Sequence, residues 1–373
     1  MRPIIGVKAY GWDWSSIHHL SMSAAAQRMV RQGMDWALVQ NLIDPLPGSA
    51  VLQTPPAKAY DDRQWVAALQ DAGLRVYQSS AIFFSPEAFA ATPDIQPVDQ
   101  HGNAFEPFGW YCGLCPTHPA WLARKSDLLA EAVYKTQPDG IFLSFLRFPG
   151  FWEMWLPPIH RNNVSEYCFC TRCIGLFAQS IQCALPAGGP SAWRHWIVTE
   201  QRSAWTTWKC NWIAGVAGQL RAAALAVQPG MDVILNGFGL GTNDLDNAVE
   251  EVLGQGLGAL NPVIDHYELM FYFQIMKRDP VPWIHERIAQ VRPQTQRTVL
   301  ACLQGQAEYM EPLYRQGHRA RAISDFEWQS ALDAVAAAGA DGVLTYSWRD
   351  LLADEAQGGQ RVAALRRYRD HKG

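Results

Sequence analysis

The chain has 373 residues, of which 49% are hydrophobic and 18% charged, and its formal net charge is −4. This composition supplies a large apolar core and argues against a strongly basic nucleic-acid-binding protein, since no stripe of Lys and Arg is present. No apolar segment approaches the ~20 residues of a transmembrane helix. No signal peptide is recognisable before the first apolar run, so the expected location is cytoplasmic.

Eight apolar runs, most of them followed by a helical pattern, are distributed along the whole chain. Continuous runs rich in Val, Ile and Leu are typical of strands that are buried on both faces, as in a parallel sheet. Eight such units predict a (β/α)8 TIM barrel, and we assign residues 1–373 to this single domain. The predicted strands are Ile4–Tyr10, Trp36–Gln40, Val76–Phe84, Gly140–Phe145, Val233–Asn236, Val263–Tyr267, Thr298–Leu303 and Gly342–Tyr346.

The predicted helices are bounded by residues that normally begin or end helices. Gly33 and Gly73 close two of them, and Ser324 with Glu327 forms a capping-box signal. The helices are expected near residues 21–31, 61–72, 119–136, 193–227, 247–255, 283–290, 325–338 and 361–370.

Two long segments interrupt this alternation of strands and helices. They cover about residues 85–117, after the third strand, and 149–190, after the fourth. Both are rich in aromatic residues, which is a poor composition for disorder. Because the loops that follow barrel strands emerge at the catalytic end, we expect both insertions to form the walls of a cleft over the C-terminal mouth.

The same rule selects candidate substrate-binding residues, because side chains just beyond the strands meet at the mouth. Tryptophan in these positions offers a flat apolar ring with a polar edge, a surface on which a sugar stacks. An arginine after the fourth strand suits either substrate binding or the stabilisation of an ionised acid. The candidates are Tyr10, Trp12, Asp13, Trp110, Arg147, Trp152, Asn236, His266, Tyr267, Gln304 and Trp348.

The region around the fourth strand carries a family resemblance. Residues 138–149 read PDGIFLSFLRFP, a CPTHP stretch precedes them at 115–119, and a CxCxxC motif follows at 168–173. This arrangement resembles uncharacterised TIM-barrel proteins that are grouped with the glycoside hydrolases. The resemblance implies a barrel over the whole chain and activity on a carbohydrate. Many of these relatives have an acidic residue in the fourth strand where this chain has Ser144, and Glu153 is the nearest carboxylate downstream.

Glycoside hydrolysis requires a carboxylic acid that protonates the leaving oxygen and a carboxylate that acts as nucleophile or base. Asp265 and Glu268 belong to the predicted sixth strand or its end. Because side chains alternate along a strand, both reach the mouth only if the chain turns after Tyr267. Asp265 is the first choice, and its alternative role is to cap a loop or pair with an arginine. The other candidate acids are Glu153, Glu268, Glu308, Asp13 and Asp350.

The cysteines suggest a structural metal site. Cys168, Cys170 and Cys173 are closely spaced, and thiolates of this kind suit tetrahedral zinc. A chain without an export signal favours metal over disulfides, although packed thiols are the alternative. The fourth ligand comes from Cys112, Cys115 or His160, and Cys112 is the working choice.

The sequence therefore predicts a glycoside hydrolase that uses two carboxylates in an aromatic-lined cleft. Its expected partner is a carbohydrate, with no nucleic acid, membrane or organic cofactor. One alternative is a barrel that binds glycans without cleaving them. The other is a lyase, isomerase or aldolase in which Lys8 forms a Schiff base.

Overall fold

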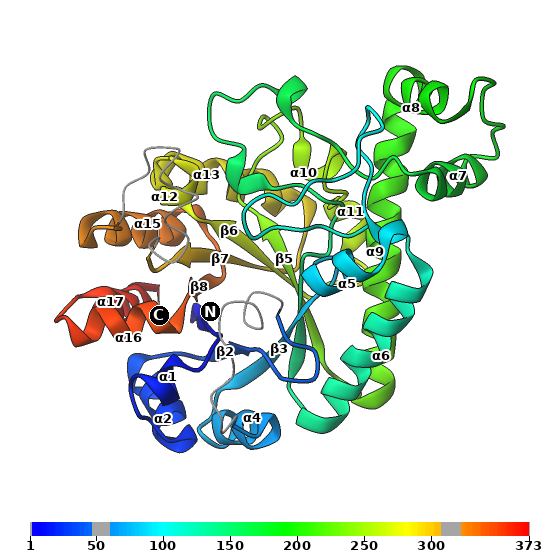
Figure 1. Ribbon diagram of the computed structural model, residues 1–373. Coiled ribbons are helices and arrows are strands. Elements are labelled where there is room, and N and C mark those ends of the chain that lie inside the picture. The colour runs from blue at the N-terminus through cyan, green and yellow to red at the C-terminus, as the bar shows by residue number, and fades with distance from the viewer. Residues whose placement is uncertain (1, 47–59, 307–321, 373) are drawn as a thin grey trace.

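The computed structural model contains a closed barrel of parallel strands in the order β1 to β8, surrounded by helices (Figure 1). The structure describes residues 2–46, 60–306 and 322–372. The predicted (β/α)8 fold is confirmed. The strands are β1 (Ile4–Ala9), β2 (Trp36–Val39), β3 (Arg75–Ala81), β4 (Gly140–Ser144), β5 (Asp232–Phe238), β6 (His266–Phe271), β7 (Thr298–Gln304) and β8 (Gly342–Tyr346).

The long helices begin where the sequence offers caps. The Ser21 and Asp61 side chains accept the backbone N–H groups of Ala24 and Gln64, and Ser324 forms the predicted capping box. The longer outer helices are α2 (Met22–Gln32), α4 (Asp62–Asp71), α6 (Pro119–Thr136), α9 (Arg202–Val227), α13 (Pro280–Val291), α15 (Asp325–Ala338) and α17 (Arg361–Lys372).

Shorter helices fill the connections between these elements. The single helix predicted over 193–227 is wrong, because the chain leaves the helical conformation at Gln201 and separates α8 from α9. The shorter elements are α1 (Asp13–Ser16), α5 (Pro86–Ala91), η1 (Pro93–Ile95), η2 (Trp152–Met154), η3 (Arg161–Asn163), α7 (Thr171–Ser180), α8 (Gly189–Glu200), α10 (Ala248–Glu251), α11 (Leu257–Leu260), α12 (Phe273–Met276), η4 (Arg292–Gln294) and α16 (Trp348–Ala356).

The strand register determines which side chains point into the barrel. Alternate residues of a strand point to opposite sides, and residues aligned across parallel strands point to the same side. Lys8 bonds Glu268 across the barrel, so both point inward. Leu38 is aligned with Lys8, and Asn236 and Leu300 are aligned with Glu268. By the alternation of their strands, the inward residues also include Tyr77, Phe142, Cys302 and Leu344. A charged pair thus occupies a layer that branched apolar side chains usually fill.

The sixth strand differs from its predicted bounds. It runs from His266 to Phe271, whereas the apolar pattern predicted Val263–Tyr267. Glu268 is the polar residue that ends the apolar run in the sequence, but its side chain lies inside the barrel with Lys8 as its partner. The shift moves Asp265 and His266 to the N-terminal end of the barrel.

The insertions after β3 and β4 pack against each other. The Phe169 N–H donates to the Val98 carbonyl at 2.7 Å. The Phe105 and Tyr167 ring centroids are 5.1 Å apart. Aromatic side chains therefore bind the two insertions together, while the assignment of the whole chain to one domain remains a prediction.

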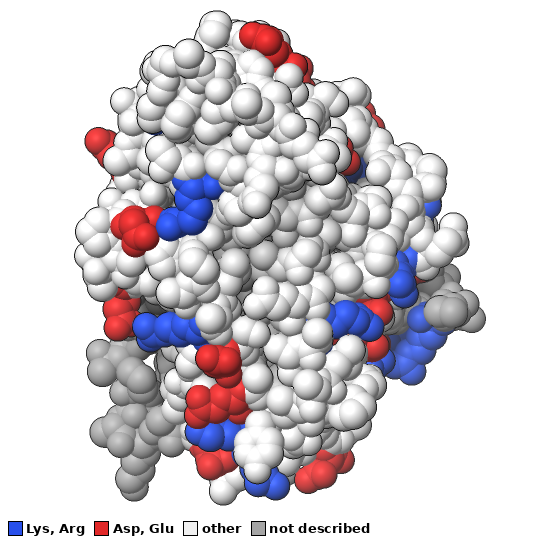
Figure 2. All heavy atoms as spheres, turned by 90° about the vertical axis from the view of Figure 1, so that its right-hand side faces the viewer, with Lys and Arg blue, Asp and Glu red and all other residues white. Residues whose placement is uncertain are grey.

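The outer surface gives two observations about partners. Among the described helices, none combines the length and the apolar character needed to cross a bilayer. On the face that carries α6 and α9, acidic and basic side chains are scattered and separated by uncharged surface (Figure 2). The described part of that face therefore lacks the continuous basic stripe that is typical of nucleic-acid binding.

Candidate active site and metal site

A buried ion pair occupies the centre of the barrel. Glu268 is fully buried and accepts hydrogen bonds from the Lys8 ammonium, at 2.9 Å, and from the Asn236 amide. Burial alone would lower the pKa of Lys8, but Cys302, Glu268 and Tyr10 together raise it above its ordinary value. Lys8 is therefore held protonated, which disfavours the Schiff-base alternative because that chemistry needs a neutral amine.

A layer of three tyrosines, which we call the tyrosine layer, lies at the C-terminal side of this pair. It consists of Tyr10, Tyr272 and Tyr346. The Tyr346 ring stacks on Tyr272 at 5.6 Å and meets the edge of Tyr10 at 6.2 Å. The Lys8 ammonium is 5.6 Å from the Tyr346 ring centroid, and the Tyr10 hydroxyl is 2.7 Å from Ser79 Oγ. The layer places aromatic faces and hydroxyl groups directly beyond the strands.

Two carboxylates act electrostatically on Tyr346. Burial raises the pKa of Tyr346, and the negative charges of Asp350 and Glu153 raise it further, while Lys8 opposes them. Asp350 is in the first turn of α16, where its carboxylate accepts the N–H and hydroxyl of Ser347 at 3.0 Å. Glu153 belongs to η2 in the insertion after β4. Two segments that are far apart in the sequence thus bring acids to the end of β8.

The environment of Asp350 keeps its proton at a higher pH than usual. Burial raises the pKa of Asp350 to about 6, although the hydrogen bonds from Ser347 and the charges of Arg349 and Arg361 oppose this. A carboxylic acid whose pKa lies near neutrality can donate a proton under ordinary conditions. The sequence offers Asp350 as one of several equivalent candidate acids, and its raised pKa distinguishes it from them.

Arg147 lies beside the second of these acids. Its side chain is 3% exposed, and its guanidinium is 4.9 Å from the Phe238 ring and 5.0 Å from that of Phe145. Burial lowers the pKa of Arg147, and the charges of Tyr111 and Glu153 partly offset this effect. Arg147 is thus a cation in an aromatic surrounding with Glu153 as its nearby countercharge.

The predicted tryptophans lie in different surroundings. Trp152 contacts Tyr272 of the tyrosine layer, with ring centroids 5.9 Å apart. Trp12 packs near Tyr60, and Trp110 packs in the aromatic cluster of the two insertions. Trp348 is buried, and its indole N–H donates to Gln32 of α2 at 2.8 Å. Trp348 therefore packs against the outer helices.

Asp265 is at the opposite end of the barrel from these groups. It precedes β6, forms an ion pair with Arg221 and accepts the Val233 N–H at 2.9 Å. Three other aspartates precede β2, β4 and β8 and accept an N–H from the preceding strand at 2.8 to 3.0 Å in the same way: Asp35, Asp139 and Asp341. The prediction that Asp265 stands at the catalytic end is wrong, since it belongs to this repeated structural arrangement.

The two residues that follow Asp265 also lie away from the mouth. His266 is 3.2 Å from the Asp232 carboxylate and 5.0 Å from the Trp36 ring, both at the starts of their strands. The Tyr267 hydroxyl donates to Asn261 at 3.0 Å on the outside of the barrel. The expectation that His266 and Tyr267 lie at the C-terminal end is wrong, because β6 begins at His266 and both residues therefore stand at its start.

The remaining candidates are near the C-terminal ends of β1 and β7. Asp13 is buried and pairs with Arg349 at 2.7 Å. Gln304 ends β7, and its amide nitrogen donates to the Gln306 carbonyl at 2.9 Å. Glu308 lies outside the described residues.

Three buried glutamines at this end have unpaired amide atoms. Among the described residues, neither amide atom of Gln40 or Gln274 has a hydrogen-bond partner, and the same is true of Gln304 Oε1. Gln40 ends the predicted second strand, so its position was visible in the sequence. Gln274 was missed because the sixth strand was predicted to end too early.

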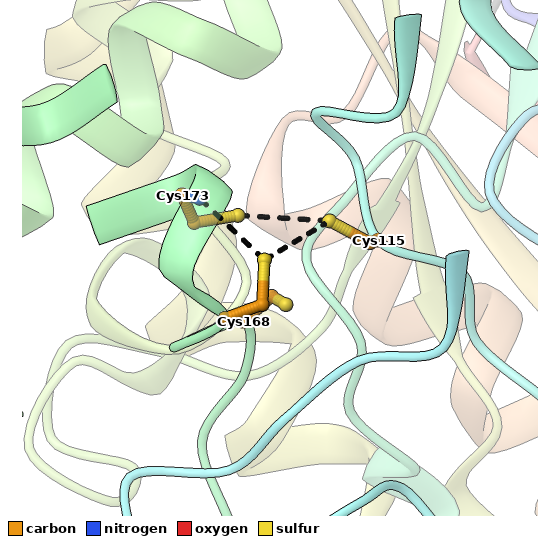
Figure 3. A group of neighbouring side chains, drawn as sticks. Cys115, Cys168 and Cys173 are labelled. Carbon is orange, nitrogen blue, oxygen red and sulfur yellow. Dashed lines mark hydrogen bonds between the residues drawn. The ribbon is translucent and has the colours of Figure 1, made fainter. Parts of the chain in front are cut away.

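Four cysteine sulfurs form a compact group. Those of Cys115, Cys168, Cys170 and Cys173 all lie within 4.8 Å of one another, and Cys115 Sγ is 3.6 Å from Cys173 Sγ and 3.8 Å from Cys170 Sγ. Figure 3 shows the three labelled side chains pointing toward one another. Tetrahedral coordination with ~2.3 Å zinc–sulfur bonds separates sulfurs by about 3.8 Å. The buried cluster therefore fits a metal ion.

The working choice of Cys112 as fourth ligand is wrong, and Cys115 takes that place. Cys112 is buried with Phe84, Phe105 and Tyr111. The chain is extended between the two cysteines, with Leu114 N–H bonded to Phe83. Residues three apart in an extended chain point to opposite sides, so only one of the two cysteines faces the cluster.

Polar neighbours compensate the charge that four thiolates would carry. The Thr117 hydroxyl is 3.2 Å from Cys173 Sγ and 3.3 Å from Cys115 Sγ. The Arg172 guanidinium is 3.9 Å from Cys115 Sγ and is oriented by Asp94 at 3.2 Å. Hydrogen bonds and a nearby positive charge of this kind are typical of the surroundings of metal-bound sulfur.

Comparison with known proteins adds information about the fold. No protein-family model matches the sequence, and no curated protein matches it. The structure is similar to the glycoside hydrolase domain of PgaB (BpsB) from Bordetella bronchiseptica, with a TM-score of 0.68 and 16% identity over 97% of this chain and 98% of that one. It is also similar to a β-galactosidase from Marinomonas ef1, with a TM-score of 0.62 and 11% identity.

A third similar structure is α-L-fucosidase isoenzyme 2 from Paenibacillus thiaminolyticus, with a TM-score of 0.55 and 16% identity over 96% of this chain. The chain spans 61% of the β-galactosidase and 50% of the fucosidase. What these proteins share with the chain is the barrel. The similarity to glycoside hydrolase barrels that the motifs around the fourth strand implied is therefore confirmed for the fold.

Proposed function

We propose that this protein is a glycoside hydrolase whose active site surrounds the tyrosine layer at the C-terminal end of the barrel. The observation that carries the proposal is that two acids from different segments, Asp350 of α16 and Glu153 of η2, lie near enough to Tyr346 at the end of β8 for both of their charges to raise its pKa. Glycoside hydrolysis needs two carboxyl groups with different protonation, one on each side of the scissile bond.

The surroundings of the two acids assign their roles. Asp350 is the general acid, because its raised pKa of about 6 keeps a proton available for the leaving oxygen. Glu153 is the nucleophile or the base, because it lies near the Arg147 guanidinium, whose pKa the charge of Glu153 raises. Glu268, which was another candidate, is bonded to Lys8 and supports the layer above it.

The substrate of this reaction is a carbohydrate or a glycoconjugate. Trp152 and the tyrosine layer supply aromatic rings of the kind on which sugars stack. The proposal is tested by incubating the protein with a panel of oligosaccharides and aryl glycosides and measuring new reducing ends and released aglycone. No product from any member of a broad panel would contradict hydrolysis.

A barrel that binds glycans without cleaving them is the second candidate. Ser144 ends β4 and donates to the Ser80 carbonyl at 3.1 Å. The family that the fourth-strand motifs resemble often has an acid at this position. Without that acid the chain depends on Glu153 for the second carboxylate. Binding of an oligosaccharide without new reducing ends would favour this candidate.

We also propose that Cys115, Cys168, Cys170 and Cys173 hold a structural zinc ion that ties together the insertions after β3 and β4. Four sulfur ligands fill a tetrahedral site and leave no position for substrate, as in other structural zinc sites. A reducing compartment keeps such thiols available, so cytoplasmic location remains part of this proposal. Elemental analysis of purified protein tests it, with about one equivalent of zinc expected for a single site.

A further inference from the structure

The buried, unpaired amides of Gln40, Gln274 and Gln304 indicate a site at which a ligand binds. Their side chains are almost completely inaccessible, with exposures of 2%, 6% and 0%. Buried polar atoms in native proteins are nearly always hydrogen-bonded, and exceptions commonly mark functional sites or bound molecules. Five unpaired amide atoms at one end of a barrel therefore point to a partner outside the described chain.

Strand register places two of these glutamines beside the tyrosine layer. Gln304 is aligned with Tyr346 in the pairing of β7 with β8. Gln40 directly follows β2, which pairs with β1 so that the next aligned residue is Tyr10. Both lie on the inward side by the alternation of their strands. They are therefore on either side of the rings that would contact a sugar.

The third glutamine approaches the same layer from the connection after β6. Gln274 is the second residue of α12, two residues beyond Tyr272 of the tyrosine layer. α12 packs against η2, the element that contains Glu153. Gln274 therefore belongs to a helix that packs against the segment of the proposed catalytic carboxylate.

The charges near the mouth already have partners, which bears on the kind of ligand. The opposite charges are Lys8 with Glu268, Arg349 with Asp13, and Arg147 with Glu153. Asp350 would act in its protonated form, and one oxygen of its carboxyl group already accepts hydrogen bonds from the N–H and hydroxyl of Ser347. Of the described unpaired buried atoms at this end, Arg147 Nε belongs to a cation whose charge Glu153 offsets, and five belong to the neutral amides of Gln40, Gln274 and Gln304, each of which can both donate and accept. Hydroxyl groups, which also donate and accept, match such amides.

We infer that Gln40, Gln274 and Gln304 form a subsite for the hydroxyl groups of a neutral sugar. A uronic acid would require an unpaired cation, and an amino sugar an unpaired carboxylate, to offset the loss of water around its charge. The position of this subsite rests on the proposed active site, but sugar binding by the amides does not require cleavage. The inference names the substrate class as a neutral glycan.

Binding is measured by calorimetry at pH 7 with the parent protein and with Asp350→Asn, which prevents turnover. The probes are neutral gluco-, galacto- and manno-oligosaccharides, an oligogalacturonate, and a glucosamine oligomer. At least one neutral series is expected to bind, and to bind tighter than either charged probe. Gln40→Met and Gln274→Met should each weaken that binding about 3- to 10-fold, the usual effect of one or two lost hydrogen bonds.

The matched control is Gln78→Met. Gln78 is equally buried on β3, but it points outward; its amide oxygen accepts a hydrogen bond from Thr136 of α6 at 3.2 Å, whereas its amide nitrogen is unpaired among the described residues. The Gln78→Met variant should be less stable than the parent protein and should bind sugar with unchanged affinity. Gln40→Met should do the reverse and raise the melting temperature, because an unpaired amide is replaced by an apolar group of similar shape.

Two results would overturn the inference: unchanged affinity in both Gln40→Met and Gln274→Met, or tighter binding of a charged probe than of every neutral one. Failure of every probe to bind would overturn it as well. Binding of a neutral sugar through the glutamines without new reducing ends would leave the subsite standing and remove only the hydrolase. The two proposals therefore fail separately.

Discussion

The two ends of the barrel differ in whether their buried polar groups have hydrogen-bond partners. At the N-terminal end, four aspartates each accept a backbone N–H from the preceding strand: Asp35, Asp139, Asp265 and Asp341. At the C-terminal end, Gln40 and Gln274 have unpaired amides and Asp350 has a raised pKa. The first pattern holds strands together, whereas the second costs stability and is expected where a ligand or substrate binds.

The largest expected effect is that of Asp350→Asn. Removing the proposed general acid should lower turnover at least ~100-fold while the fold is kept, since Asn can still accept the hydrogen bonds from Ser347. In the parent, activity should fall as pH rises through about 6, because Asp350 must be protonated to act. The variant should lose this dependence, which a pH profile of kcat/KM measures.

Ser347→Ala is the matched control, because it removes one hydrogen bond of the α16 cap and keeps the acid. A loss of turnover in Ser347→Ala as large as that in Asp350→Asn would assign Asp350 to the cap alone. Glu153→Gln is expected to lose a similar share of turnover, but its remaining activity should still fall as pH rises through about 6.

The next effect tests the metal. Cys170→Ser should lower the zinc content well below one equivalent and lower the melting temperature by several degrees, because the insertions lose a shared ligand set. Cys112→Ser, outside the cluster, should keep the metal. Elemental analysis and thermal unfolding measure both. Metal-free parent protein with the same melting temperature would show that the sulfurs are packed thiols.

Asp265→Asn should affect stability and leave chemistry unchanged. The charge that pairs with Arg221 is lost and the hydrogen bond from Val233 is weakened, so the free energy of unfolding should fall by about 1–3 kcal/mol. Asp139→Asn, the equivalent before β4, should behave alike. Denaturant unfolding and kcat measure the two effects, and a large fall in kcat with normal stability would reverse the roles of the barrel ends.

The smallest effect concerns the pH dependence of stability. The folded pKa of Asp350 is about 6, above the ordinary value of 3.8. Its stabilising contribution is therefore fully present below pH ~4 and is lost as pH rises through about 6. Asp350→Asn should gain stability relative to the parent between pH 4 and pH 7. A difference that stays constant over this range would mean that the acid is solvated in the folded protein.

The local sequence was sufficient for the architecture. Eight apolar runs separated by amphipathic helices are buried well only as a parallel barrel, and the aromatic insertions follow the strands predicted for them. Cys168, Cys170 and Cys173 were recognisable because their spacing places their sulfurs near one another within one segment. These features can be predicted from periodicity and short-range spacing, because they depend on residues that are neighbours in the sequence.

The site depended on contacts between segments that are distant in the sequence. Glu268 is tolerated within β6 because Lys8 of β1 neutralises it, so the polar residue did not end the strand and Asp265 fell at the other end. Cys115 replaced Cys112 because the extended chain turns only one of them toward the cluster. Asp350 became distinct from the other candidate acids through its raised pKa, which depends on the chain that surrounds it. Burial and charge pairing arise from the closed barrel, and for this reason only the tertiary structure decided them.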